Sequence, residues 1–177
     1  MRLREYLKES FEILEIENFF SETICRECID IAEQGDWRTS NLGTRKIQTT
    51  QLDRGWLEGL LREHIPHEIQ GWHYEGIHPA TCQFFKYTEN DTFPNHQDAP
   101  IEVSPRVQSL FTLVVYLNDC HGGETGFPEK NKTLAPRLGR AVIFPQNFLH
   151  NSARVGSGLK YILRAQVLYR REGEVAY

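Results

Sequence analysis

The feature that most constrains the fold is a series of short β-type segments that fills the chain from about Gly76 onward. Val, Leu, Phe, Tyr and Thr dominate these segments, and Gly, Pro and Asn separate them. They are TCQFFKY, QSLFTLVVYLN, GETGF, RAVIFP and KYILRAQVLY. Several short strands spaced by turn residues are typical of an antiparallel sandwich or barrel. We therefore expect an α+β, mainly β fold, with a double-stranded β-helix (jelly-roll) core and N-terminal supporting helices.

The N-terminal part of the chain is expected to support this core. Residues 11–20 carry an apolar alternation that predicts a strand entering a turn. Ser21 can cap a helix that runs to about Gln34. A second amphipathic helix is expected from about Asp53 to Ile69, and Pro66 should end it early. We expect a single domain over residues 1–177, with residues 1–72 as helical support and residues 73–177 as the jelly-roll catalytic core.

Composition limits the partners and the compartment. The formal net charge is −4 and no basic run stands out, so nucleic acid is not an expected partner. No apolar stretch approaches the ~20 residues of a membrane span, so no membrane partner is expected either. The charged N-terminal stretch lacks the apolar centre of a secretory signal, which predicts a cytoplasmic location. The sequence carries no signal for the oligomeric state.

The four cysteines fit a reducing compartment as free thiols. Cys25 and Cys28 form a CxxC, which raises the question of a redox or zinc site. The pair lies one turn apart on an expected helix, no second CxxC completes a zinc site, and no strand leads into it. We therefore interpret both cysteines as structural.

A candidate metal site is spread over the β-rich half. His96 and Asp98 stand in HQD, and His150 and Lys160 follow in later segments. Residues i and i+2 on an extended segment project to the same face, so His96 and Asp98 can meet one ion. Two imidazoles and one carboxylate can occupy one face of Fe(II) and leave the opposite face open. A cation shortly after the second histidine can then hold the distal carboxylate of a 2-oxoacid.

An HxD pair alone has little specificity. A second pair of the same form, His73 and Glu75, lies upstream. We discount it because it follows the expected helix instead of lying between strands, and because it lacks the local context of His96.

That context resembles a known family. The stretch from Tyr87 to Arg171 is similar to the catalytic core of prolyl 4-hydroxylase-like 2-oxoglutarate/Fe(II) dioxygenases. The matching pieces, in order, are FKYTENDTFPNHQD, TLVVYLND, GGETGFP, LGRAVIFPQNFLHNSARV and GLKYILRAQVLYRR. The set covers about half of the chain and is much more specific than any single piece.

The resemblance implies the metal, the cosubstrate and their residues. His96, Asp98 and His150 would be the catalytic Fe(II) ligands, and Lys160 would pair with the C5 carboxylate of 2-oxoglutarate. O2 would be the co-reactant, with ascorbate as a reductant. In a site of this kind the metal carries the hard chemistry, and the barrel supplies orientation and excludes water.

Four further side chains are candidates for binding cosubstrate or substrate. Tyr87 and Tyr116 match family positions whose hydroxyls face the cosubstrate, although buried aromatics on barrel strands would look the same. Lys160, Arg164 and Gln166 share one face of an expected strand. Because the spacing assigns Lys160 to 2-oxoglutarate, Arg164 is expected to face the primary substrate, with Gln166 beside it, or a neighbouring carboxylate. An ion pair at the barrel edge is the alternative for Arg164.

The resulting prediction is a dioxygenase that hydroxylates an aliphatic C–H bond of an amino acid, peptide or small metabolite and converts 2-oxoglutarate to succinate and CO2. Asp98 favours hydroxylation over halogenation, because related halogenases need that position vacated for chloride. Desaturation or ring closure stays open. The alternatives are a protein prolyl hydroxylase, a non-catalytic cupin-like metal-binding or sensing protein, and a structural jelly roll with incidental histidines.

Overall fold

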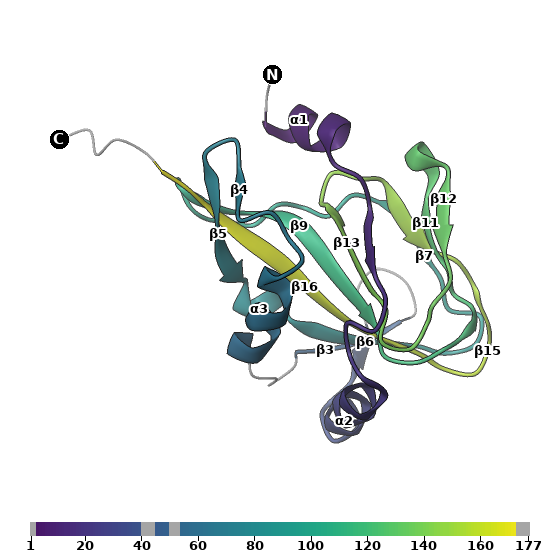
Figure 1. The fold of residues 1–177 in the computed structure, drawn as a ribbon. Coiled ribbons are helices and arrows are strands. Elements are labelled where there is room, and N and C mark those ends of the chain that lie inside the picture. Colours follow the sequence, from purple (N-terminus) through teal and green to yellow (C-terminus); the bar gives the residue numbers. More distant parts are fainter. Residues whose placement is uncertain (1–2, 40–44, 50–53, 173–177) are drawn as a thin grey trace.

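The computed structural model describes residues 3–39, 45–49 and 54–172, and strands dominate its regular structure (Figure 1). The described helices are α1 (Leu3–Ser10), α2 (Glu22–Glu33) and α3 (Arg54–Arg62), with 3-10 turns at Pro79–Thr81 and Pro128–Lys130. The strands are β1 (Leu14–Ile16), β2 (Arg38–Thr39), β3 (Lys46–Thr49), β4 (Glu68–Ile69), β5 (Trp72–Ile77), β6 (Gln83–Tyr87), β7 (Phe93–His96), β8 (Glu102–Ser104), β9 (Val107–Tyr116), β10 (His121–Gly122), β11 (Thr125–Phe127), β12 (Lys132–Leu134), β13 (Ala141–Pro145), β14 (His150–Ser152), β15 (Val155–Ser157) and β16 (Lys160–Arg171).

Two antiparallel sheets form the body of the molecule. The larger sheet has the order β1-β13-β9-β16-β6-β3-β2, with β5, β4 and β8 attached off this path. The smaller sheet has the order β12-β11-β14-β7, and β10 and β15 form a separate two-stranded ribbon. In Figure 1 the long strands β9 and β16 run side by side, and β7, β11 and β12 gather to one side of them. The mainly β, jelly-roll architecture expected from the sequence is confirmed.

Hydrophobic side chains cover both faces of the larger sheet. Because successive residues of a strand point to opposite faces, neighbours such as Leu113 and Val114, or Ile162 and Leu163, belong to different core clusters. Val114 and Ile162 face the smaller sheet, whereas Leu113 and Leu163 face the helices. The cluster between the sheets includes Phe85, Tyr87, Phe93, Tyr116, Phe127, Leu134, Phe144 and Phe148.

The expected N-terminal helix is present. The Ser21 side chain caps α2 by accepting a hydrogen bond from the backbone nitrogen of Ile24. α2 buries Cys25 and Cys28 against the core, and burial raises the pKa of these thiols to about 11 and about 12. All four cysteines are free. Protonated, buried thiols of this kind are inert, which agrees with a structural role for the CxxC.

The second expected helix, predicted from about Asp53 to Ile69, ends earlier in the structure. α3 ends at Arg62, ahead of Pro66, and the expected start at Asp53 lies outside the described residues. The chain then forms a β4–β5 hairpin whose two turn residues, Gln70 and Gly71, both have positive φ angles. This backbone matches the right-handed twist of the flanking strands.

The N-terminal part also contributes strands to the larger sheet. The expectation that residues 1–72 form a helical support is therefore incomplete. β1 pairs with β13, and β3 pairs with β6. An unpaired strand edge leaves backbone N–H and C=O groups without partners, so short N-terminal segments can add to the edges of the larger sheet. The expected boundary between the helical support and the jelly-roll core, at residue 72, falls within the β4–β5 hairpin.

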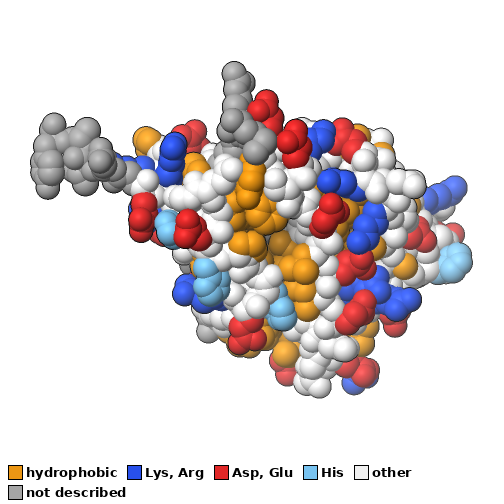
Figure 2. Space-filling model, turned by 45° about the horizontal axis from the view of Figure 1, so that its top comes forward, with side chains coloured by type: hydrophobic (Ala, Val, Ile, Leu, Met, Phe, Trp, Pro, Cys, Tyr) orange, Lys and Arg blue, Asp and Glu red, His pale blue; other side chains and the backbone are white. Residues whose placement is uncertain are grey.

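Figure 2 shows a band of hydrophobic side chains on the face that carries the N-terminal segment, with acidic and basic side chains interspersed around it. A pocket lined mainly by apolar residues includes Phe11, Ile13, Leu14, Ile65 and Pro66, with Glu12 and His64 also in its wall. Among the described residues, no helix has both the length and the apolar character needed to cross a membrane.

Candidate metal centre and cosubstrate cavity

The pairing of β7 with β14 brings the candidate ligands together. His96 ends β7, His150 begins β14, and the two residues lie opposite each other in the ladder, with ring centroids 4.1 Å apart. Asp98 follows β7, and its backbone nitrogen donates to the carbonyl oxygen of Gln146. His96 Nε2 lies 3.8 Å from Asp98 Oδ1, and His150 Nε2 lies 3.9 Å from Asp98 Oδ2. One ligand atom from each side chain lies within 4.8 Å of the others.

Backbone carbonyls orient both imidazoles. His96 Nδ1 donates to the oxygen of Pro94 and His150 Nδ1 donates to the oxygen of Phe148, each at 2.9 Å. Because a carbonyl oxygen only accepts, Nδ1 carries the proton and the Nε2 lone pair is free for a metal. Burial lowers the pKa of His150 to about 4 and also lowers the pKa of His96. Both rings are therefore neutral near pH 7, as metal binding requires.

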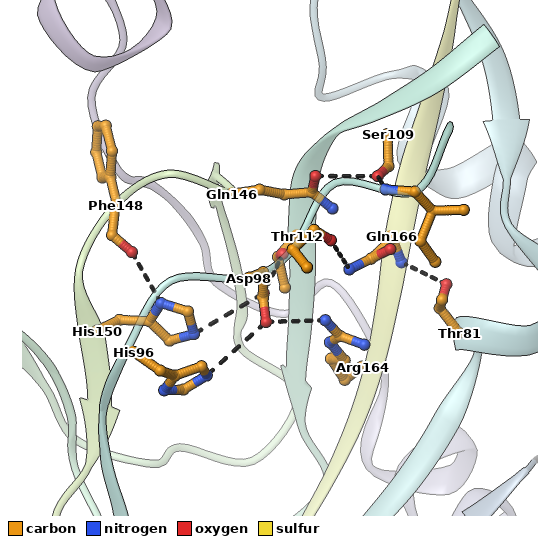
Figure 3. Close-up of polar contacts among 12 residues, drawn as sticks. Thr81, His96, Asp98, Ser109, Thr112, Gln146, Phe148, His150, Arg164 and Gln166 are labelled. Atoms are coloured by element: carbon orange, nitrogen blue, oxygen red, sulfur yellow. Dashed lines mark hydrogen bonds and ion pairs between the residues drawn. The ribbon is translucent and has the colours of Figure 1, made fainter. Parts of the chain in front are cut away.

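Asp98 is held from the opposite side of the cluster, as Figure 3 shows. Its Oδ2 accepts a 2.5 Å hydrogen bond from Thr112 Oγ1, and its Oδ1 lies 2.9 Å from Arg164. Burial alone would raise the pKa of Asp98, but the charge of Arg164, the neighbouring His150 and the Thr112 hydrogen bond outweigh burial. The pKa therefore lies below its ordinary value, and the carboxylate is ionised.

Two neutral imidazoles and one ionised carboxylate are a donor set that fits Fe(II). The set carries one negative charge, which favours the binding of a divalent cation. The three side chains also line a cavity of about 370 Å³, into which the open side of a bound ion would face. The three side chains therefore fit the Fe(II) ion that the sequence predicts.

Lys160 lies in the same cavity wall, at the start of β16. Its side chain is buried, and Nζ donates to the carbonyl oxygen of Gly123 at 2.6 Å and to Ser152 Oγ at 2.8 Å. Burial and, to a smaller extent, the charge of Arg45 lower the pKa of Lys160 to about 7, against Cys120 and Glu124, which raise it. A buried ammonium with neutral partners is suited to pair with an anion.

The two tyrosines expected beside the cosubstrate are placed differently. Tyr87 lines the cavity and its hydroxyl accepts a 2.7 Å hydrogen bond from Arg45. Tyr116 is fully buried, and its hydroxyl donates to Thr125 Oγ1 at 2.6 Å. Thr125 contributes to the cavity wall, whereas the Tyr116 ring packs behind it. The structure thus brings Tyr87 to the cavity and leaves Tyr116 one layer back.

Arg164 and Gln166 share a face of β16 with Lys160, as the strand spacing predicts. Arg164 lines the cavity at its metal end, against Asp98. Gln166 is buried outside the cavity lining, and its Nε2 donates to the carbonyl oxygen of Ala99 at 3.3 Å. Its amide therefore contacts the segment that follows Asp98.

Two residues of the site escaped the sequence analysis. Thr112 gives no sequence signal beyond its place on a β strand. Arg45 precedes β3, far upstream of the other site residues, and reaches the cavity because β3 pairs with β6. The discounted His73 lies within strand β5, so the first of the two reasons for discounting it, its position outside the strands, is wrong. Its ring nevertheless lies 3.8 Å from Glu172 and outside the His96 cluster.

Comparisons with known proteins agree with this geometry. The model of the 2OG-Fe(II) oxygenase superfamily matches residues 82–165, which include the three candidate ligands and Lys160. None of the curated proteins compared matches this sequence.

Solved structures with the same fold cover nearly the whole chain. The viral collagen prolyl hydroxylase from Paramecium Bursaria Chlorella virus-1, in a 2OG complex, is 22% identical, with a TM-score of 0.68 over 93% of this chain and 98% of that chain. A prolyl hydroxylase from Trichoplax adhaerens, in complex with a hypoxia inducible factor peptide fragment, is 16% identical, with a TM-score of 0.71 over 93% and 86%. HygX from Streptomyces hygroscopicus, with nickel, 2-oxoglutarate and hygromycin B bound, is 13% identical, with a TM-score of 0.65 over 97% and 87%.

The structural likenesses concern the jelly-roll fold, and the family match covers the segment that forms the candidate metal centre. Together with the His-Asp-His cluster where β7 ends and β14 begins, the family match supports a 2-oxoglutarate-dependent dioxygenase. Residues 82–165 thus match the 2OG-Fe(II) oxygenase superfamily, and the chain shares the fold of solved prolyl hydroxylases.

Proposed function

We propose that this dioxygenase hydroxylates an aliphatic C–H bond of an amino acid, a short peptide or a small metabolite. In this proposal His96, Asp98 and His150 hold Fe(II), and Lys160 binds the distal carboxylate of 2-oxoglutarate. With O2 as the co-reactant, bound iron would supply the oxidative chemistry: one oxygen atom is inserted into the C–H bond and the other enters succinate, which forms from 2-oxoglutarate with release of CO2. The observation that carries the proposal is the convergence of the three ligand side chains on a cavity that also contains a buried lysine.

The remaining residues orient the reactants. Tyr87 contacts the cosubstrate directly, and Tyr116 acts through Thr125, to which its hydroxyl donates. Arg164 stands at the metal end of the cavity, where it orients Asp98 and faces the primary substrate. Gln166 holds the segment after Asp98 through Ala99. Side chains locked in this way keep the reacting carbon at a fixed distance from the metal.

The substrate class follows from the charge of the cavity wall. Arg164 is a cation at the metal end of the cavity, where the reacting carbon must lie, and a guanidinium binds carboxylates in a bidentate manner. We therefore favour a substrate with a free carboxylate, such as an amino acid or the end of a short peptide. A protein prolyl hydroxylase is the alternative, supported by the Trichoplax relative that binds a peptide. In either case the whole chain acts as one catalytic domain.

Turnover assays test the reaction and the substrate together. The purified protein is supplied with Fe(II), 2-oxoglutarate and ascorbate, the proposed reductant, and with a panel of amino acids and proline-containing peptides. We expect succinate to form in step with a product heavier by one oxygen atom. His150→Ala should abolish both, whereas the matched His73→Ala, at a half-exposed histidine of β5, should retain both. Metal binding without succinate formation or O2 uptake would instead indicate a cupin-like binding protein.

We also propose a cytoplasmic location. Four free cysteines, three of them buried, support it, because thiols stay reduced in that compartment.

A further inference from the structure

Arg45 reaches the cavity from a part of the chain that the family match does not cover. Its guanidinium lies 3.5 Å from the ring centroid of Phe93 and 4.4 Å from that of Phe85. One terminal nitrogen donates to the Tyr87 hydroxyl at 2.7 Å. Two aromatic faces and one hydrogen bond hold the guanidinium in a defined position.

Tyr87 lies between Arg45 and Lys160. Its hydroxyl accepts from Arg45, and Lys160 Nζ, which donates to Ser152 Oγ, lies 4.7 Å from the centroid of the Tyr87 ring. Arginine and lysine side chains have donors only, so the Tyr87 oxygen serves as the acceptor toward Arg45. The phenolic proton of Tyr87 is then available to an acceptor in the cavity.

The group formed by Arg45, Lys160, Ser152 and Tyr87 has more donors than acceptors. Arg45 Nε is buried and has no hydrogen-bond partner among the described residues. Asp98 is the one carboxylate among the described residues that line the cavity, and it faces the imidazoles and Arg164. Two buried or half-buried cations without a carboxylate in the same wall are costly unless an anion binds between them.

We propose that Arg45 and Lys160 together bind the distal carboxylate of 2-oxoglutarate, with the Tyr87 hydroxyl as a third donor. The inference rests on the proposed function, which assigns that carboxylate to Lys160. It adds a second, permanently charged residue from the N-terminal part of the chain. The site should therefore select dicarboxylic over monocarboxylic 2-oxoacids through both cations.

Binding of two defined ligands tests this assignment. The full chain is loaded with Mn(II), and calorimetry measures the Kd of 2-oxoglutarate and of 2-oxopentanoate, which has the same chain length without the distal carboxylate. The variants are Arg45→Gln, Arg45→Lys and the control Arg26→Gln, at an exposed arginine of α2 paired with Glu22. Thermal unfolding of each variant checks that it is folded.

Loss of a charged hydrogen bond in a buried site should raise the 2-oxoglutarate Kd of Arg45→Gln about 10- to 100-fold. The 2-oxopentanoate Kd should change less than about twofold, because that ligand lacks the group that Arg45 binds. Arg45→Lys should recover part of the affinity, and Arg26→Gln should behave as wild type. Equal losses for both ligands, or no loss for either, would overturn the inference. If the wild-type protein failed to bind 2-oxoglutarate at all, the proposed function would fail and this inference with it.

Discussion

Replacing the buried Lys160 with methionine should change how the stability of the ligand-free protein depends on pH. Burial holds the pKa of Lys160 at about 7 in the folded protein, against 10.5 for an exposed lysine. Between these two values the unfolded chain binds a proton that the folded protein does not. The free energy of unfolding of the wild-type protein should therefore rise with pH in this window and should gain nothing from Lys160 below pH 7.

The size of the effect follows from the pKa difference. Each pH unit well inside the window contributes about 1.4 kcal/mol, but Lys160 is already half titrated at pH 7, so the interval from pH 7 to pH 9 contributes about 2 kcal/mol. Lys160→Met removes the titrating group and keeps a side chain of similar length. The wild-type free energy of unfolding minus that of Lys160→Met should thus increase by about 2 kcal/mol from pH 7 to pH 9, and groups common to both proteins cancel.

Urea unfolding at pH 6, 7, 8 and 9 measures this difference. The measurement is repeated with saturating Mn(II) and 2-oxoglutarate. An anion beside Lys160 should keep the lysine protonated, so the free energy of unfolding of the wild-type protein should then depend less on pH, whereas that of Lys160→Met should not change its pH dependence. A difference between the two proteins that stays constant from pH 6 to pH 9 would refute the reasoning, since Lys160 would then titrate as an ordinary lysine.

Three further outcomes are expected. Thr112→Val removes the hydrogen bond to Asp98 Oδ2 and should weaken Mn(II) binding about 10- to 100-fold, as measured by calorimetry; unchanged affinity would show that Thr112 does not orient the ligand. The Kd of 2-oxoglutarate should rise up to tenfold per pH unit above about pH 7, because Lys160 must regain a proton to bind the anion; a flat profile would contradict that assignment. Gly139 has φ +75° and a Cβ there would overlap the carbonyl oxygen of Phe20, so Gly139→Ala should lower the free energy of unfolding by about 2 kcal/mol or more in urea, and a smaller loss would argue against this packing.

Parts of the site were predictable because they follow from the period of a β strand. His96 and Asp98 lie two positions apart, as the sequence analysis required, and their side chains meet that of His150 because β7 and β14 pair antiparallel. Lys160 and Arg164 line one cavity for the same reason. The helix cap at Ser21 was equally visible, because its signal is local.

The parts that sequence reasoning missed depend on contacts between distant segments. Arg45 reaches Tyr87 because β3 pairs with β6 in the larger sheet, and no local sequence pattern predicts that pairing. Tyr116 and Gln166 have the expected strand positions, yet hydrogen bonds to Thr125 and Ala99 keep their polar groups out of the cavity. Strand period predicts the face of a side chain, whereas tertiary packing decides how far the side chain reaches.

Anomalous diffraction from crystals soaked with Mn(II) tests the central claim most directly. The account predicts one manganese peak at bonding distance from Nε2 of His96, Nε2 of His150 and a carboxylate oxygen of Asp98. In crystals that also contain 2-oxoglutarate, the distal carboxylate should lie against Lys160. A peak elsewhere, or no peak at these three side chains in a protein that binds Mn(II) in solution, would contradict the account.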